Sequence, residues 1–296
     1  MAEDFELTLF DRIEMIKLVL KDRAEDEIYI SYSGGKDSTV LSKLIDLALP
    51  DNKIDRVYCN TGIEFMEVVA FVKEQQKQDS RIKIITPAKN IKTTLEEIGY
   101  PFKSKLHSEY VERYQRSGTT SKSVKKYLAE GGTGKFSCPK MLRYQFTEDF
   151  NLKISQKCCL EFKKKPFKKF EKENRKTLVM TGIRGAEGGV REYQAEHGCV
   201  FKKKDGTIYK FNPISPCSNE FVEWFINKYD VKLCKLYSDP YNFTRTGCKG
   251  CPYNLHLAKE LEVLEQYLPQ ERKQCEIIWK PVYDEYRRIG YRKMKK

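Results

Sequence analysis

The segment that most constrains the fold of this chain is Ser-Gly-Gly-Lys-Asp-Ser at residues 33–38, because it lies between a strand pattern and a helix pattern. Residues 28–32, Ile-Tyr-Ile-Ser-Tyr, are mostly β-branched and aromatic and predict a strand. Residues 37–49 carry apolar side chains at helical spacing, and the turn at Pro50 ends the pattern. The sequence therefore predicts a strand, a tight glycine turn and a helix in immediate succession.

Strand and helix patterns continue to alternate after this unit. The further strands are expected at residues 56–59, 82–85 and 177–181, and the helices between them at residues 64–78 and 91–98. An opening helix capped by Thr8 is expected before the first strand. This alternation predicts an α/β fold with a doubly wound, mostly parallel sheet.

The SGGKDS loop, as we call residues 33–38, has the features of a phosphate site. Its two glycines can adopt backbone angles closed to other residues, and the helix start offers unpaired N–H groups and the positive end of the helix dipole. The lysine adds charge, the serines add hydroxyl donors, and a Mg²⁺ ion among phosphates would explain the aspartate. The residues expected to bind nucleotide here are Ser33, Gly34, Gly35, Lys36, Asp37 and Ser38. The loop is not a Walker A motif, and the alternative is a helix that merely starts after a glycine turn.

The loop is similar to the signature of the PP-loop ATP pyrophosphatases, which bind ATP and cleave it between the α- and β-phosphates. Three further segments resemble the phosphoadenosine phosphosulfate (PAPS) reductase-like branch of that superfamily. They are residues 60–65 (Asn-Thr-Gly-Ile-Glu-Phe), residues 181–184 (Thr-Gly-Ile-Arg) with Glu187 and Arg191 after them, and residues 213–226, which begin Pro-Ile-Ser. The resemblance spans roughly residues 25–255 and implies the adenine nucleotide alpha hydrolase-like fold.

This resemblance also implies where an adenine nucleotide binds. The residues that it puts beside the nucleotide are Thr61, Gly62, Glu64, Gly182 and Arg184, with Arg184 at the anionic end. Catalytic roles are expected for Lys36, Asp37 and Arg184. We expect residues 1–254 to form this nucleotide-binding domain and residues 255–296 a C-terminal helical segment. A stretch rich in Ser, Thr, Gly and Lys near residues 115–137 is expected to be a mobile insertion or lid.

Ten cysteines in a chain expected to be cytosolic favour metal binding or catalysis over disulfides. Four of them form two close pairs, Cys158-Cys159 and Cys248-x-x-Cys251, and four thiolates suit either zinc or an iron–sulfur cluster. Unligated thiols are the third alternative. The arrangement resembles the [4Fe–4S] ligand set of adenylyl-sulfate (APS) reductases, which implies such a cluster here. Cys59 is expected in the core, and Cys138 is either a reactive thiol or a buried, inert one.

The net charge of +13 has two interpretations: a polyanionic partner, for which tRNA or DNA is the candidate, or a solvated lysine-rich surface. The mean hydropathy of −0.64 and the lack of an apolar run of about 20 residues predict a soluble protein without a membrane partner. The first ten residues lack the basic region of a signal peptide, so a cytoplasmic location is expected.

Two departures from the reductases shape the functional hypotheses. Those enzymes carry a catalytic cysteine in a Glu-Cys-Gly-[Ile/Leu]-His segment, which this sequence lacks, and they usually have a degraded phosphate loop, which is complete here. The leading hypothesis is therefore cleavage of ATP to AMP and pyrophosphate, coupled to sulfur transfer with a sulfur-donor protein as a further partner. The alternatives are an APS or PAPS reductase that releases sulfite and a non-catalytic nucleotide-binding redox sensor or partner subunit.

Overall fold

The computed structural model describes residues 3–129, 137–188 and 190–294, and the chain divides into two compact units. The first unit consists of Met1–Asn60, Met66–Thr86 and Pro166–Thr246. The second unit consists of Thr61–Phe65, Pro87–Lys165 and Gly247–Lys296. The C-terminal residues thus share a unit with residues 87–165, whereas the sequence suggested a separate segment from residue 255.

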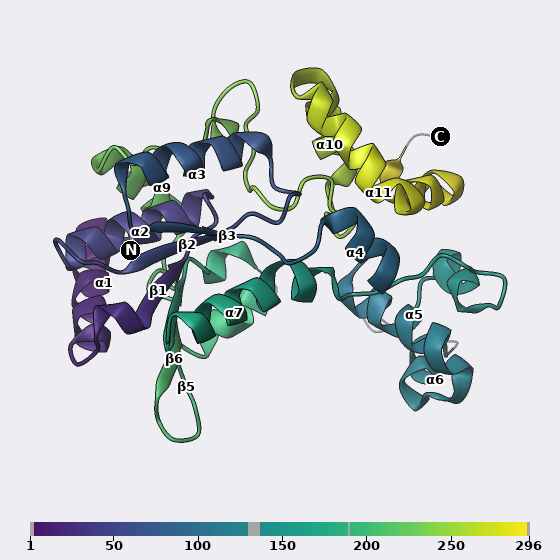
Figure 1. Ribbon diagram of the computed structural model, residues 1–296, viewed down its shortest axis with the longest axis horizontal. Helices are drawn as coiled ribbons and strands as arrows, with labels where there is room; N and C mark the ends of the chain where they lie inside the picture. Colours follow the sequence, from purple (N-terminus) through teal and green to yellow (C-terminus); the bar gives the residue numbers. More distant parts are fainter. Residues whose placement is uncertain (1–2, 130–136, 189, 295–296) are drawn as a thin grey trace. The chain divides into compact units, whose positions relative to one another are not determined.

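The first unit is built around a six-stranded sheet in the order β3-β2-β1-β4-β6-β5 (Figure 1). Its strands are β1 (Ile28–Ser31), β2 (Asp55–Cys59), β3 (Ile82–Ile85), β4 (Leu178–Thr181), β5 (Val200–Lys202) and β6 (Ile208–Phe211). Neighbouring strands run parallel except in the edge pair β5–β6. From β1 the order runs outward in both directions, so the predicted doubly wound, mostly parallel α/β fold is confirmed.

Six α-helices belong to the described part of the first unit, and the first of them starts earlier than predicted. They are α1 (Phe5–Leu20), α2 (Lys36–Ala48), α3 (Met66–Gln78), α7 (Lys165–Glu173), α8 (Val190–Glu196) and α9 (Asn219–Lys228). At the start of α1 the Asp4 side chain accepts hydrogen bonds from the N–H groups of Glu6 and Leu7, both at 3.1 Å. The prediction that Thr8 caps this helix is wrong, because an earlier aspartate already supplies the acceptor.

Helices cover both faces of the sheet. Ile28 and Ile30 of β1 belong to a core shared with α1, α2 and α9, whereas Tyr29 packs with Phe167 and Phe170 of α7. Alternate residues of a strand point to opposite faces, so these two sets lie on opposite sides of β1. Figure 1 shows α7 across the sheet from α2. The continuous apolar run in β1 therefore reflects a strand buried on both faces.

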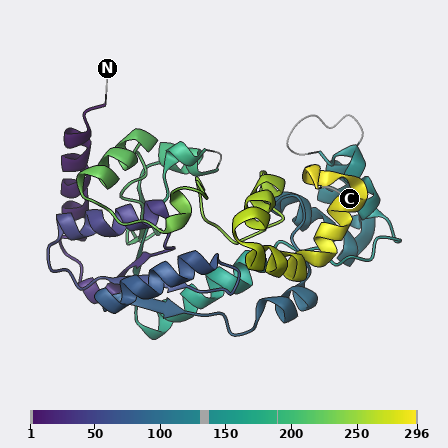
Figure 2. The ribbon, with the colours of Figure 1, turned by 90° about the horizontal axis from the view of Figure 1, so that it is seen from above.

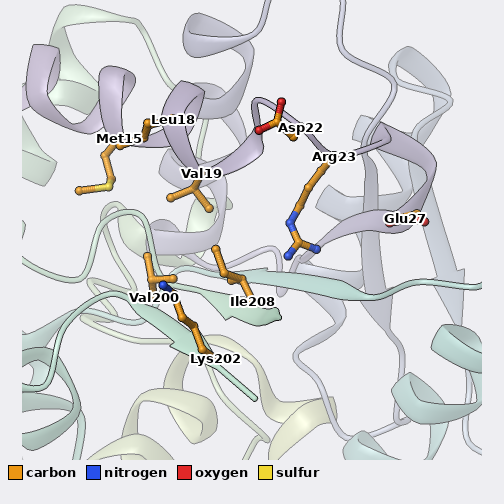
Figure 3. A pocket seen from close by; sticks show the side chains of 9 residues that line it. All are labelled: Met15, Leu18, Val19, Asp22, Arg23, Glu27, Val200, Lys202 and Ile208. Atoms are coloured by element: carbon orange, nitrogen blue, oxygen red, sulfur yellow. The ribbon is translucent and has the colours of Figure 1, made fainter. Parts of the chain in front are cut away.

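The β5–β6 hairpin is missing from the sequence prediction, although Asp205-Gly206 between its short strands is a typical hairpin dipeptide. A cavity of about 620 Å³ lies between this hairpin and α1 (Figure 3). Its lining includes Met15 and Val19 of α1 and Ile208 of β6. No residue of the SGGKDS loop lines it.

The described part of the second unit is mainly helical. Its main helices are α4 (Ile91–Ile98), α5 (Lys105–Ser117), α6 (Lys122–Leu128), α10 (Leu257–Tyr267) and α11 (Pro269–Ile289). The last two pack against each other (Figure 2). Part of the segment expected to be a mobile insertion is α6, whose Tyr127 is buried and stacked on Tyr110. Residues 130–136 of that segment lie outside the described residues.

One histidine is buried in the second unit. His107 of α5 has Nδ1 2.9 Å from Tyr127 Oη and Nε2 2.7 Å from Gln145 Oε1. Burial lowers the pKa of His107 to about 4, so the ring is neutral at pH 7. None of the helices in the described ranges is both long and apolar enough to cross a bilayer.

Candidate functional site

The SGGKDS loop leaves the carboxyl end of β1, the strand at which the sheet order changes direction. The neighbouring strand β4 ends level with it, because Ser31 is paired with Thr181. In open α/β sheets, ligands bind outside the carboxyl ends of the strands at this switch point. The first unit therefore brings the loop and residues 182–184, which follow β4, to the same edge of the sheet.

Two glycines permit close packing around the loop. Gly34 has φ +67°, and a Cβ on it would lie 2.7 Å from Val72 Cγ2. A Cβ on Gly182 would lie 2.9 Å from the carbonyl carbon and oxygen of Asp37. Any side chain at either position would force its neighbours apart. The residues after β4 therefore pack directly on the first turn of α2.

The loop presents hydroxyl and N–H groups around the start of α2. Ser33 Oγ and Ser38 Oγ are 3.0 Å apart, and Ser38 Oγ donates to the Gly35 carbonyl oxygen at 2.9 Å. The helix begins at Lys36 without a side-chain cap. Within the described part of the chain, no protein acceptor takes the backbone N–H of Asp37 or Ser38. Such N–H groups, at the positive end of a helix dipole, attract anions.

A buried arginine holds the loop aspartate. Arg184 is 2% exposed, and its Nε donates to Asp37 Oδ1 at 2.8 Å. Its other two guanidinium nitrogens donate to the Cys217 carbonyl oxygen at 3.3 Å and to Asn219 Oδ1 at 3.1 Å. Each guanidinium nitrogen of Arg184 thus has a protein acceptor, and the side chain positions Asp37. The contact of Arg184 with the anionic end of a nucleotide stays a prediction. Asp37 Oδ2 has no donor among the residues that the structure describes, so it can bind a cation.

A second arginine, Arg191, adds positive charge near Asp37, and Arg245 lies close enough to Arg191 to repel it. Burial and then repulsion from Arg245 lower the pKa of Arg191, while attraction to Asp37 raises it. Arg191 also forms an ion pair with Glu187. This part of the first unit therefore favours an anionic ligand.

A tyrosine from a distant part of the sequence contacts the start of α2. Tyr237, in the 3₁₀ turn η6 (Lys235–Tyr237), accepts a hydrogen bond from Lys36 N at 3.0 Å, and its Oη is 2.8 Å from Thr246 Oγ1. A Cβ on Gly35 would lie 3.1 Å from Tyr237 Oη and 3.2 Å from Thr246 Oγ1. Burial raises the pKa of Tyr237, so the phenol keeps its proton. The sequence gives no signal for this contact, because 201 positions separate the partners.

The four cysteines predicted to bind a metal all belong to the second unit. Cys158 and Cys159 immediately precede a π-helical turn, η4 (Leu160–Lys164). Their Sγ atoms are 4.0 Å apart, although successive side chains of a regular element diverge. Single π-helical turns occur frequently at functional sites.

These thiols influence one another's protonation. A hydrogen bond with Cys159, burial and the charges of Cys251 and Cys248 raise the pKa of Cys158. Burial raises the pKa of Cys248, and burial and Cys248 raise that of Cys251. The pKa of Cys159 is lowered by its hydrogen bond from Cys158 and by neighbouring lysines. The four thiols therefore lie near one another in the second unit.

The cysteine loop, residues 248–251, is held in place by α11. Trp279, Tyr283 and Tyr286 donate hydrogen bonds to the carbonyl oxygens of residues 249, 250 and 252. Gly250 has φ +62°, and a Cβ on it would lie 2.7 Å from Cys275 Sγ. The aromatic spacing of four and three residues puts all three donors on one helix face. This aromatic spacing is the sequence signal from which the contact could have been predicted.

Lys249, between the two cysteines, is buried as well. Its side chain is 2% exposed, with Nζ 3.4 Å from Glu271 Oε2 and 2.5 Å from Gln274 Oε1. Its backbone N–H donates to the Ile63 carbonyl oxygen at 2.8 Å. The loop is therefore attached both to α11 and to residues 61–65.

Glu64, in the segment predicted to contact the nucleotide, lies next to the cysteine loop. The Thr61 N–H donates to Glu64 at 2.8 Å, and Lys163 Nζ lies 3.7 Å from Glu64 Oε1. The backbones of Glu64 and Cys248 form an antiparallel bridge. Gly62 has φ +84° with open space around it. The position of Thr61, Gly62 and Glu64 beside a nucleotide stays a prediction.

The spacing of the four cysteine sulfurs can be compared with what a zinc ion or an iron–sulfur cluster requires. The described residues contain no group of three or more His, Cys, Asp or Glu side chains arranged to hold a metal ion. A tetrahedral zinc ion with Zn–S bonds of 2.3 Å would need its sulfurs about 3.8 Å apart. An iron–sulfur cluster puts several irons and sulfides between its cysteines and so spaces them more widely. The two sulfurs of the first pair, Cys158 and Cys159, are 4.0 Å apart, which is close to the zinc value. A cluster at these four cysteines therefore stays a prediction that rests on the resemblance.

The remaining cysteines are mostly buried. Cys59, at the end of β2, is 6% exposed, so its predicted place in the core is confirmed. Cys138 is 5% exposed, and burial raises its pKa to about 11. A buried thiol with a raised pKa is a poor nucleophile, which favours the inert alternative for Cys138.

Comparison with known proteins gives a family and several distant likenesses. The sequence matches the phosphoadenosine phosphosulfate reductase domain over residues 27–133 and 135–254. An uncharacterized protein of Methanocaldococcus jannaschii is 25% identical over 261 residues, which cover 87% of this chain and 49% of that protein. The chain thus spans about half the length of this curated relative.

Two solved structures are similar at low identity. The phosphoadenylyl-sulfate (PAPS) reductase from Candida auris, in a phosphate complex, shares 15% identity at a TM-score of 0.44, over 76% of this chain and 82% of that one. The U34-tRNA thiolase NcsA from Methanococcus maripaludis, with its [4Fe-4S] cluster, shares 14% at a TM-score of 0.41, over 96% and 80%. The family match is the stronger finding. Because it extends from just before β1 to beyond the cysteine loop, the chain belongs to the phosphoadenosine phosphosulfate reductase domain family.

Proposed function

We propose that this chain cleaves ATP to AMP and pyrophosphate and couples this step to sulfur transfer at a four-cysteine iron–sulfur centre. The observation that carries the first half is the complete SGGKDS loop, with the unused N–H groups of Asp37 and Ser38 beside Lys36. A pyrophosphate leaving group carries more charge than the single phosphate of AMP. A full set of donors at one helix start suits that larger anion.

In this proposal an acceptor oxygen attacks the α-phosphorus of ATP, the bond from that phosphorus to the bridging oxygen breaks, and pyrophosphate leaves. Lys36 and the N–H groups of α2 stabilise the charge that develops on pyrophosphate. Asp37, fixed by Arg184, offers Oδ2 to Mg²⁺. When bound, Mg²⁺ would act as a Lewis acid on the phosphate oxygens. A sulfur nucleophile at the oxidation level of sulfide then displaces AMP from the acceptor.

The second half rests on the gathered thiols. Cys158, Cys159, Cys248 and Cys251 would hold a [4Fe–4S] cluster, which would bind the incoming sulfur. Lys163 lies close enough to Cys248 for the thiolate charge to raise the pKa of the ammonium. Its positive charge would stabilise thiolate ligands at this centre.

The expected partners are an adenine nucleotide, a sulfur-donor protein and a nucleic acid acceptor, tRNA or DNA. The support for the last is the net charge of +13, because lysine and arginine contacts to phosphates release counterions. Binding of this kind should weaken steeply as salt is raised from 50 to 200 mM.

The test uses anaerobically purified protein with labelled ATP, APS or PAPS. We expect iron and sulfide in the protein, AMP and pyrophosphate from ATP when an acceptor is present, and little sulfite from APS or PAPS with thioredoxin. Lys36→Ala and Asp37→Ala should reduce turnover and the stabilisation by Mg·ATP, whereas Lys43→Ala, at an exposed position of the same helix, should not. Cys158→Ser should lose the iron, with Cys199→Ser as its control.

Each alternative has its own signature. Robust thioredoxin-dependent sulfite release would make the chain a reductase. Nucleotide binding without turnover would favour a sensor or partner subunit. Stabilisation by Mg·ATP that is unchanged in both loop variants would show that the SGGKDS loop is not the site.

A further inference from the structure

The start of α2 is not open on all sides, because a hydroxyl pair from the end of the first unit faces it. Tyr237 Oη accepts the N–H of Lys36, the first N–H of the helix, at 3.0 Å. Thr246 Oγ1 lies 2.8 Å from the same oxygen. The point where a Gly35 Cβ would stand is 3.1 to 3.2 Å from both hydroxyls and from Ser33 Oγ. Three hydroxyl groups thus surround the second glycine of the loop.

The segment that carries this pair is firmly attached within the first unit. Leu236 is fully buried, and the N–H of Phe243 donates to its carbonyl oxygen at 2.8 Å. Lys235 Nζ forms an ion pair with Glu67 Oε2 of α3 at 2.8 Å. Tyr237 is therefore held beside the loop by packing on both sides.

The hydrogen bond from Lys36 leaves the Tyr237 proton free to point elsewhere. Because the phenol oxygen already accepts an N–H, its own O–H is a stronger donor than an isolated phenol. In the structure this proton can be donated to Thr246; an anion beside Gly35 offers a better acceptor, since hydrogen bonds to charged groups are the stronger ones. The Tyr237 hydroxyl can thus extend the attraction that the N-terminus of α2 has for anions to a ligand beside Gly35.

We propose that Tyr237 and Thr246 are phosphate-binding residues of the nucleotide site, with Tyr237 donating directly to a phosphate of the bound nucleotide. This inference rests on the proposed nucleotide site at the SGGKDS loop. It extends that site to residues outside every segment that the sequence motifs identify. The ligand chemistry is a polyphosphate, and the adenosine part plays no role in it.

The test compares Tyr237→Phe and Thr246→Val with wild-type protein and with Tyr209→Phe, a control tyrosine of the same unit that is 42% exposed. Calorimetry measures binding of Mg·ATP, magnesium pyrophosphate and adenosine. We expect Tyr237→Phe to weaken ATP and pyrophosphate about tenfold or more, because one hydrogen bond to a charged group is lost. Thr246→Val should weaken both less, and adenosine should bind all variants equally.

Four results would overturn the inference. Unchanged pyrophosphate affinity in both variants would make the pair structural, and tighter binding would make Tyr237 a plug that competes with phosphate. Equal losses for adenosine and pyrophosphate would indicate a general disturbance of the fold. If wild-type protein binds neither ATP nor pyrophosphate, the proposed function fails along with the inference, which separates that outcome from the others.

Discussion

At the scale of single residues, His107 ties the stability of the second unit to pH. The unfolded chain binds a proton at this histidine below about pH 6.5, whereas burial delays protonation in the folded protein to about pH 4. Acidification through this window therefore favours unfolding, and the contribution of His107 is fully present only above it.

We expect this residue to account for about 3 kcal/mol of stability lost between pH 6.5 and pH 4. His107→Gln should therefore show a flatter decline in the free energy of unfolding across that range, measured by urea titration at several pH values. His256→Gln changes an exposed histidine and should follow the wild-type slope. Equal slopes for all three proteins would contradict the assignment.

Some residues of the candidate site could be predicted because their chemistry is local. The glycines, lysine and aspartate of the SGGKDS loop sit next to one another, so their place between a strand and a helix could be predicted, and that place is confirmed. The protein acceptors of Arg184, which are Asp37, Cys217 and Asn219, were not predicted, because they come from other parts of the chain. Tyr237 was not predicted for the same reason. Its contact with Lys36 is set by tertiary packing, which a local sequence pattern does not encode.

At the scale of elements, the strands with β-branched runs were predicted best. Residues 82–85 form the edge strand β3 as expected, because a short β-branched run has few alternatives. The β5–β6 hairpin was missed despite its Asp-Gly turn, since its three- and four-residue strands give too little alternation to detect. α6 was missed because its composition resembles that of a loop.

The element with the sharpest testable role is α11. We expect Trp279→Phe and Tyr283→Phe each to destabilise the second unit by about 1–3 kcal/mol, because each leaves a buried carbonyl oxygen of the cysteine loop without its donor. Thermal unfolding measures this directly. If the cysteines carry a metal centre, the same variants should lose it faster to a chelator.

Ile277→Ala is the matched control, because this side chain lies on the same helix and is 62% exposed. It should change stability by less than about 0.5 kcal/mol. Equal effects of all three substitutions would mean that α11 contributes by general packing and that its hydrogen bonds to the cysteine loop add nothing.

At the scale of the whole molecule, each unit is assembled from three separate stretches of chain. The sequence suggested a boundary at residue 254, where the recognisable motifs end, because motifs are read along the chain. The contacts that define the units follow packing instead, and packing brings α10 and α11 together with α4 and α5 in one unit.

A chain ending at Asn254 tests this division. It keeps the matched family residues but loses α10 and α11, which bury Leu261, Trp279 and Tyr283 in the second unit. The core around β1 and β4 lies wholly within the first unit. Hydrogen exchange should therefore show lost protection in α5 and retained protection in β1. Uniform loss across both units would contradict the division.

Because α11 fixes the cysteine loop through hydrogen bonds, the order in which the chain is synthesised limits when the four thiols can come together. Ribosomes add about 5–20 residues per second, so Cys248 is made roughly 5–20 s after Cys159, and the aromatic donors follow later still. The nascent chain thus emerges with one reactive pair of thiols and no second pair to meet it. A centre that uses all four thiols can be completed only after Cys251 has been made. Insertion of a metal centre must therefore follow the second pair, and the interval before that is when Cys158 and Cys159 are most open to oxidation.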